Sequence, residues 1–187
     1  MTNATTFVSR LRTARVVAQV ACADEADAAK LARTLSSRGV SAVELSAWTP
    51  TVVAAIAEAD PGLLIGARAT SAEELHVLAV VGTTFVTLPS VDRALLDSAR
   101  TLRLPALPDV AGHVEAIAAA REGATVVRLD VAGPADGLEA LRRYARLFPR
   151  LAFVPSGAIG AERIPGYLNE PSVVAVATTC PPERLAR

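Results

Sequence analysis

The stretch Val126-Val127-Arg128-Leu129-Asp130 places two charged side chains at alternate positions of an otherwise aliphatic run. Successive side chains of a β-strand point to opposite faces, so Arg128 and Asp130 share one face and Val127 and Leu129 share the other. Polar residues at period two inside a buried strand are what the interior of a closed barrel requires. We therefore expect Val127 and Leu129 to face outward, and Arg128 and Asp130 to face a barrel interior.

Two earlier runs repeat this alternation. In Ala42–Ser46, Glu44 and Ser46 alternate with aliphatic residues and are expected to face inward. In Val16–Cys22, Gln19 lies between two apolar neighbours in the same way. The interior of the expected barrel is therefore partly polar, with side chains contributed by several strands.

Short apolar runs alternate with Ala-rich amphipathic stretches along the whole chain, which predicts parallel βαβ units. The strands are expected at Val16–Cys22, Ala42–Ser46, Leu63–Ala67, Thr84–Leu88, Pro105–Leu107, Thr125–Asp130, Ala152–Pro155 and Val173–Ala177. The helices are expected at Phe7–Thr13, Asp24–Arg38, Pro50–Ala59, Ser71–Val80, Val91–Leu102, Gly112–Glu122, Asp136–Phe148 and Ala161–Leu168.

An open doubly wound sheet also fits this order, but no Gly-rich nucleotide-binding turn follows the first strand, which continues Cys22-Ala23-Asp24. We predict an α/β fold, a (β/α)8 TIM-type barrel formed by residues 1–187 as one domain. After the eighth strand, the segment 180–187 is short and contains two prolines, so the last helix is expected to be truncated or missing. The N-terminal helix, a neighbouring subunit or a partner chain would then complete the wall.

Composition excludes several classes of protein. The formal net charge is 0, and no basic patch is interleaved with aromatic residues, so we expect no nucleic-acid partner. No apolar run has membrane-spanning length, and residues 1–15 lack the apolar core of a signal peptide, which predicts a cytoplasmic protein without a membrane partner. The two cysteines, Cys22 and Cys180, and the two histidines, His76 and His113, form no metal-ligand motif. We expect no metal and no cofactor.

Lysine is nearly absent. Of the 19 Lys and Arg residues, Lys30 is the one lysine. It lies off the apolar stripe of the expected helix Asp24–Arg38, on a face with charged neighbours. A Schiff-base lysine has to be a neutral amine, which usually means burial or a neighbouring cation. We therefore do not expect Schiff-base chemistry at Lys30.

Sites in such barrels form at the carboxyl ends of the strands. The polar residues at or near those ends are Glu44, Arg68, Arg128, Asp130, Ser156, Thr178 and Thr179. Glu44, Arg128 and Asp130 together can do acid/base work and hold an anionic substrate. The alternative is a buried ion-pair network, with Arg128 paired to Asp130 or to Glu44.

Three further features have both a binding and a structural interpretation. The turn Pro155-Ser156-Gly157-Ala158, expected at the start of a helix, suits a phosphate or carboxylate, although Ser and Gly also serve as ordinary caps. Trp48 follows a strand end and would be a substrate wall or a packing residue. Arg68 would clamp an anion or be exposed to solvent. His113 begins a helix and is expected to be solvated.

Several motifs, taken in order, resemble the class I 2-keto-3-deoxy-6-phosphogluconate (KDPG) aldolases, which include 4-hydroxy-2-oxoglutarate aldolases. They are Leu11–Val17, Val43-Glu44-Leu45-Ser46-Ala47-Trp48-Thr49-Pro50, Gly66-Ala67-Arg68, Phe85–Pro89, Leu107–Ala111 with Glu115, and Phe153–Ile159. The resemblance runs over nearly the whole chain and implies a (β/α)8 barrel that usually forms trimers. A homo-oligomer and a small-molecule ligand are therefore expected.

The chain departs from the family's pattern at its reactive positions. Arg128 stands where the resemblance places the Schiff-base lysine, and arginine stays protonated and forms no imine. Trp48 stands at the family's substrate-carboxylate arginine, Leu88 at its serine before the fourth-strand proline, and Thr178-Thr179 at its Gly-Ser. Glu44, which corresponds to the family's acid/base residue, is kept.

Two hypotheses follow. In the first, the barrel binds a small anionic or carbonyl compound and runs a non-covalent lyase, isomerase or cyclase reaction, with Glu44 as acid/base and Arg128 as anion clamp. Asp130 would orient Arg128 or act as a second acid, and Glu44→Gln would abolish turnover without affecting folding. In the second, the chain is an inactive aldolase homologue that serves as a binding or assembly subunit. An open, solvent-filled pocket around Glu44 and Arg128 favours the first hypothesis. A pocket plugged by Trp48 and Leu88, with Arg128 locked in a saturated ion pair, favours the second.

Overall fold

The computed structural model describes residues 3–22, 24–131 and 136–179. Eight parallel strands pair in sequence order, and β8 closes the sheet onto β1. They are β1 (Val16–Ala21), β2 (Ala42–Ala47), β3 (Leu64–Arg68), β4 (Phe85–Leu88), β5 (Ala106–Val110), β6 (Val126–Asp130), β7 (Ala152–Gly157) and β8 (Val176–Thr178). The predicted (β/α)8 barrel is confirmed.

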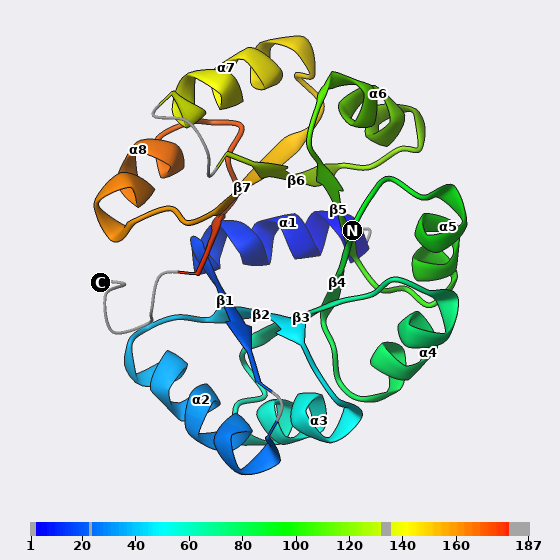
Figure 1. Cartoon of the computed structure of the whole chain (residues 1–187), viewed down its shortest axis with the longest axis vertical. Helices are drawn as coiled ribbons and strands as arrows, with labels where there is room; N and C mark the ends of the chain where they lie inside the picture. The colour runs from blue at the N-terminus through cyan, green and yellow to red at the C-terminus, as the bar shows by residue number, and fades with distance from the viewer. Residues whose placement is uncertain (1–2, 23, 132–135, 180–187) are drawn as a thin grey trace.

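A ring of helices surrounds this barrel, and the first helix lies across its middle, as Figure 1 shows in a view along the barrel axis. In chain order the helices are α1 (Asn3–Ala14), α2 (Glu25–Ser37), α3 (Pro50–Ala59), α4 (Ala72–Val80), α5 (Arg93–Thr101), α6 (His113–Arg121), α7 (Gly137–Leu147) and α8 (Ile164–Leu168), with a 3-10 turn at Ala161–Arg163 before α8. In the described part of the chain, none of the helices is long and apolar enough to cross a membrane.

Side-chain caps mark the starts of helices α2, α3, α4 and α5. Asp24, Thr49, Ser71 and Asp92 each accept a hydrogen bond from a backbone N–H in the first turn of the helix that follows. Each cap satisfies one of the N–H groups that the first turn leaves without a helical partner. The turns between strand and helix are therefore specified locally by the sequence.

The hydrophobic core has two parts, one outside the sheet and one inside it, because successive side chains of each strand point to opposite faces. Outward-facing residues such as Val43, Leu45, Val127 and Leu129 pack against the ring of helices. Inward-facing residues from the first half of the strands form a second cluster inside the barrel. The outward direction predicted for these four residues is confirmed.

Helix α1 closes the amino-terminal end of the barrel. Its Phe7 and Leu11 belong to the inner cluster, together with strand-initial residues such as Ala42 and Leu64. Figure 1 accordingly shows α1 crossing the middle of the barrel instead of lying in the outer ring. A truncated or missing last helix was expected at residues 180–187, which lie outside the described residues.

The last strand differs from the prediction. It was expected at Val173–Ala177, but β8 spans Val176–Thr178, and Val173 makes only an isolated bridge to Phe153. The run 173–177 is apolar throughout, so its alternation has no polar residue to mark where the strand begins. The boundary follows from pairing with β1 and β7, which the sequence pattern does not contain.

Gly66 provides a test of the inner core. It faces inward on β3, and an added Cβ would lie 2.1 Å from the Phe85 ring, which in turn packs on Phe7 with ring centroids 5.2 Å apart. We predict that Gly66→Ala lowers the free energy of unfolding by about 1–3 kcal/mol through overpacking, measured by urea denaturation.

The matched control for this change is Gly166→Ala in α8, where the new methyl group would meet Leu138 at an ordinary 3.8 Å. The control is expected to unfold at the wild-type urea concentration or slightly above it. Adding Phe85→Leu to Gly66→Ala should restore part of the lost stability by making room. Equal midpoints for Gly66→Ala and Gly166→Ala would contradict the packing described here.

Candidate functional site

A polar layer lies inside the barrel, on the carboxyl-terminal side of the apolar inner cluster. It is made by Gln19 on β1, Glu44 on β2, Thr87 on β4, Asp109 on β5 and Arg128 on β6. Gln19 is the register partner of Glu44, and Asp109 is the register partner of Arg128. Because partners on adjacent parallel strands point the same way, these pairs meet side by side. The inward direction predicted for Gln19, Glu44 and Arg128 is confirmed.

Arg128 is the centre of this layer. Its Nε donates to Asp109 Oδ1 at 2.5 Å, and its Nη2 donates to Asp109 Oδ2 at 2.6 Å, which makes a bidentate pair. Its Nη1 donates to Glu44 Oε1. The Arg128 side chain is 7% exposed and that of Glu44 is 3% exposed, so this ion pair is shielded from water. A buried ion-pair network is therefore present. Glu44, one of the two expected partners of Arg128, takes part in it, and the second carboxylate is that of Asp109 and not of Asp130.

Glu44 has hydrogen-bond donors at both carboxylate oxygens. Thr87 Oγ1 donates to Oε1 at 2.9 Å, and Gln19 Nε2 donates to Oε2 at 3.1 Å. Together with Arg128, three side chains orient this carboxylate. Such a fully satisfied buried group is rigid, because moving it would leave several polar atoms without partners.

The environment keeps Arg128 charged. Burial alone lowers the pKa of its guanidinium, but the hydrogen bond to Asp109 and the charges of Glu44 and Asp109 outweigh burial, so the pKa is raised above its usual value. A cation whose pKa is raised on folding contributes stability that is complete below the pKa of the unfolded chain. This contribution therefore does not change with pH through the physiological range.

A cavity of about 370 Å³ opens at the carboxyl end of the barrel, beside Arg128. We call it the barrel mouth, and its lining residues are Gln19, Pro89, Asp109, Val110, Ala111, Arg128, Asp130, Ser156 and Gly157. Glu44 is not among these residues, because it lies beneath Arg128. The carboxylates that border the cavity are those of Asp109 and Asp130, and Asp130 is exposed at the end of β6.

Trp48 and Leu88 do not plug the barrel mouth. The Trp48 indole Nε1 donates to the carbonyl oxygen of Arg68 at 2.7 Å, and its ring packs against the outer core. Leu88 is buried in the same outer core, while Thr87 beside it faces inward. Arg68 is half-buried, and its Nη1 donates to Asp109 Oδ2 at 3.2 Å, which extends the network to a second guanidinium.

The turn around Ser156 differs from its prediction. It was expected at a helix start, but Ser156 and Gly157 are the last residues of β7, and the next helical turn begins at Ala161. The Ser156 hydroxyl donates to the carbonyl oxygen of Leu129 at 3.4 Å, and Ala158 is exposed. Gly157 has φ 121, which only glycine adopts readily, so this turn depends on its identity.

Of the two threonines at the end of the barrel, Thr178 is fully buried and Thr179 is exposed. The Thr178 hydroxyl donates to the carbonyl oxygen of Ile159 at 2.7 Å, which links β8 to the loop after β7. Neither threonine lines the barrel mouth. In the part of the chain that the structure describes, no three His, Cys, Asp or Glu side chains gather as a metal site would require.

Asp109 is the site residue that the candidate list did not include. The fifth strand was expected at Pro105–Leu107, but β5 spans Ala106–Val110 and continues through Pro108. The signal was present: Leu107 and Asp109 alternate with Pro108 and Val110, as Arg128 and Asp130 alternate in β6. An inward-facing acid on the strand next to Arg128 is a natural partner for it.

The chain is similar to aldolases of known sequence and structure. The family described as KDPG and KHG aldolase matches residues 7–181. The chain belongs to this family. Among curated KDPG aldolases, that of Pseudomonas aeruginosa is 30% identical over 172 residues, which cover 90% of this chain and 78% of the relative. The enzyme of Zymomonas mobilis is 29% identical over 171 residues, which cover 90% and 82%.

Solved KDPG aldolases also share its fold. The Zymomonas mobilis enzyme with 3-phosphoglycerate superposes with a TM-score of 0.82 at 28% identity, over 93% of this chain and 84% of that one. The Legionella pneumophila enzyme, with pyruvate captured as a covalent carbinolamine intermediate, gives a TM-score of 0.81 at 25% identity, over 92% and 86%. Membership of the KDPG aldolase family, expected from the sequence motifs, is confirmed.

Glu44→Gln tests the buried network of this KDPG aldolase relative. The sequence led us to expect unchanged folding, but the structure places Glu44 in a shielded ion pair with Arg128. We predict that Glu44→Gln lowers the free energy of unfolding by about 3 kcal/mol, because Arg128 would keep a buried charge with one carboxylate fewer. Chemical denaturation followed by circular dichroism measures this change.

The matched control is Glu58→Gln on the exposed side of α3, which removes the same charge from the surface. That variant should stay within about 0.5 kcal/mol of the wild type. A Glu44→Gln protein as stable as Glu58→Gln would show that the buried pair contributes nothing to folding.

Proposed function

We propose that this aldolase-family barrel binds a small anionic or carbonyl compound at its mouth and catalyses a non-covalent acid/base reaction, without a Schiff base. The observation that carries the proposal is the position of Arg128, whose guanidinium borders the cavity on the interior face of β6. A permanently charged donor at the floor of a polar cavity suits an oxyanion, carboxylate or enolate oxygen.

Lys30 supports the absence of imine chemistry. It is the one lysine of the chain, and it is exposed on α2 in the outer ring of helices. A Schiff-base lysine is usually buried or lies beside a second cation, and an exposed lysine outside the barrel interior has neither feature. The reactions of the family that start from a lysine imine are therefore not expected from this chain.

Arg128 has donors to spare for a ligand. A guanidinium carries five N–H groups, and three of them are used by Asp109 and Glu44. The remaining two would hold a ligand oxygen in the barrel mouth. In this arrangement Glu44 is a positioning residue, because it lies outside the lining of the cavity and orients Arg128 from below.

Asp130 is the proposed acid/base residue. It lines the same cavity as Arg128, follows it by two residues on the same strand, and is exposed to solvent. A carboxylate beside the bound oxyanion can move a proton to or from the carbon next to a carbonyl group. This assignment favours Asp130 over Glu44, whose two oxygens are occupied by three donors.

The second candidate function is an inactive homologue that serves as a binding or assembly subunit. It is favoured by the mutual neutralisation of the polar layer, in which two arginines, Arg68 and Arg128, face two carboxylates, Asp109 and Glu44. Such a network can exist for structural reasons alone. The two functions differ in whether the barrel mouth changes a bound compound.

Reductive trapping tests the absence of a Schiff base. The protein is incubated with pyruvate and sodium borohydride, and its intact mass is measured. We predict no mass increase, because the interior carries a guanidinium at position 128 and the one lysine lies exposed on α2, outside the barrel. The Legionella pneumophila enzyme, which captures pyruvate covalently, is the positive control. A stoichiometric adduct on this chain would contradict the proposal.

Proton exchange tests the acid/base function. In deuterated water, NMR follows the methyl protons of pyruvate, which exchange when a base forms the enolate. We predict exchange above the rate in buffer, slowed at least about 100-fold by Asp130→Asn, since the amide cannot accept the proton. Asp27→Asn on exposed α2 removes a surface carboxylate and should leave the rate unchanged. Exchange at the buffer rate with the wild-type protein would favour the inactive homologue.

A further inference from the structure

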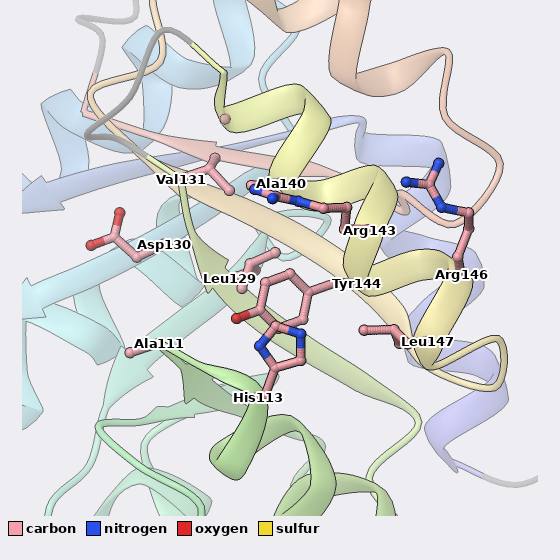
Figure 2. A pocket seen from close by; sticks show the side chains of 11 residues that line it. Ala111, His113, Leu129, Asp130, Val131, Ala140, Arg143, Tyr144, Arg146 and Leu147 are labelled. Carbon is pink, nitrogen blue, oxygen red and sulfur yellow. The ribbon is translucent and has the colours of Figure 1, made fainter.

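A second cavity, of about 500 Å³, lies between α6 and α7 beside the end of β6. We call it the α6–α7 groove, and Figure 2 shows the side chains that line it. They are Ala111, His113, Leu129, Asp130, Val131, Gly137, Ala140, Arg143, Tyr144, Arg146 and Leu147. Its volume lies within the range of small-molecule sites, roughly 300–1,000 Å³. The role proposed above for the barrel mouth does not explain this groove.

Two stacked rings form one side of the groove. The His113 and Tyr144 rings lie with centroids 4.7 Å apart and an interplanar angle of 29°. Figure 2 shows them lying against each other, with Leu129 and Leu147 nearby. His113 is exposed at the start of α6, as expected, and its ring also packs on the Tyr144 ring of α7. Flat rings with aliphatic neighbours favour a planar group of a ligand.

The groove is also positively charged. Arg143 lines it and has no hydrogen-bond or ion-pair partner among the described residues, and Arg146 is held only by Glu139 at 3.5 Å. In Figure 2 the Asp130 carboxylate points away from the two rings. A guanidinium without a carboxylate partner, next to an apolar and aromatic surface, suits a phosphate or carboxylate attached to a planar group.

The groove and the barrel mouth adjoin each other. Asp130 and Ala111 line both cavities, so these two residues form the border between the groove and the barrel mouth. A compound that reaches over these two residues would contact Arg128 at one end and Arg143 at the other. The two arginines suit a compound with two polar ends. Arg128 would meet an oxygen anion or carbonyl group at one end, and Arg143 would meet an anionic group at the other.

We propose that the α6–α7 groove binds the planar, negatively charged end of a ligand whose carbonyl or oxyanion end lies in the barrel mouth. The part of this inference that concerns the barrel mouth rests on the proposed function; the groove is argued from its own residues. The substrate class is thus an elongated compound with an aromatic or heteroaromatic anion at the end remote from the reacting carbonyl group.

The two histidines make the groove directly observable, because His113 lines it and His76 lies on exposed α4. Phenyl phosphate is titrated into the full chain, and the imidazole signals are followed by NMR. We expect the His113 signal to shift and saturate while the His76 signal stays in place. Inorganic phosphate, which lacks the ring, should bind at least about threefold more weakly.

Arg143→Ala should weaken phenyl phosphate binding by roughly tenfold or more, since it removes a charged donor. Arg121→Ala is the matched control, because Arg121 is exposed at the end of α6 and does not line the groove. Both positions are exposed, so folding should be unaffected. A His113 signal that does not move, an equal loss in both variants, or equal affinity for inorganic phosphate would overturn the groove as a planar-anion site.

The connection between the two cavities is tested with phenyl phosphate and pyruvate together. We expect an interligand nuclear Overhauser effect between the phenyl protons and the pyruvate methyl group, lost in Arg143→Ala and kept in Arg121→Ala. Binding of both compounds without this effect would overturn the shared site and leave the proposed function standing. Binding of phenyl phosphate without any binding of pyruvate would overturn the proposed function, and with it the shared site, while the groove remained.

Discussion

The ion pairs of Arg128 with Glu44 and Asp109 hold together the interior of the barrel at the carboxyl ends of its strands, and the rest of that end depends on them. It joins β2, β5 and β6 across the interior and uses three of the five guanidinium N–H groups. A charge that is 7% exposed is tolerated only with such partners. The network therefore sets the orientation of the group that the barrel mouth presents to a ligand.

The apolar inner cluster at the amino-terminal end of the barrel makes this network possible, because it excludes water from that side. Phe7 and Leu11 of α1 pack into the inner cluster, and the Phe85 ring occupies the space that Gly66 leaves empty. With that end sealed, the polar layer is reached from the carboxyl ends of the strands. Arg128 and Asp130 line the cavity at those ends, and on the proposed function they are the side chains that a ligand would contact.

Membership of the KDPG aldolase family and the chemistry of this interior are separate matters, because a fold supports many reactions by changing a few side chains. The family match covers residues 7–181, and the solved enzymes share the barrel fold. On β6, the position that the sequence resemblance assigns to an imine-forming lysine is Arg128. Its permanent charge favours binding of an oxygen anion over nucleophilic attack.

Much of the fold and part of the site could be predicted from the sequence, because strand alternation is a local property. It identified Val127 and Leu129 as outward-facing and Glu44 and Arg128 as inward-facing, and both expectations are confirmed. It failed at Asp109 because the expected strand Pro105–Leu107 ended before this residue, whereas β5 continues to Val110. It also could not locate the start of β8, since an apolar run has no polar residue to mark its phase.

By itself, the sequence determined the alternation of strand and helix units, the inward direction of Gln19, Glu44 and Arg128, and the absence of any lysine from the barrel strands. Only the tertiary structure decided the partners. Glu44 and Arg128 are 84 residues apart and meet because the barrel closes, and Asp109 joins them through its register with Arg128. Likewise, the His113–Tyr144 stack exists because α6 and α7 are neighbours in the ring. Alternation is a property of one strand, whereas pairing depends on how distant strands and helices are brought together.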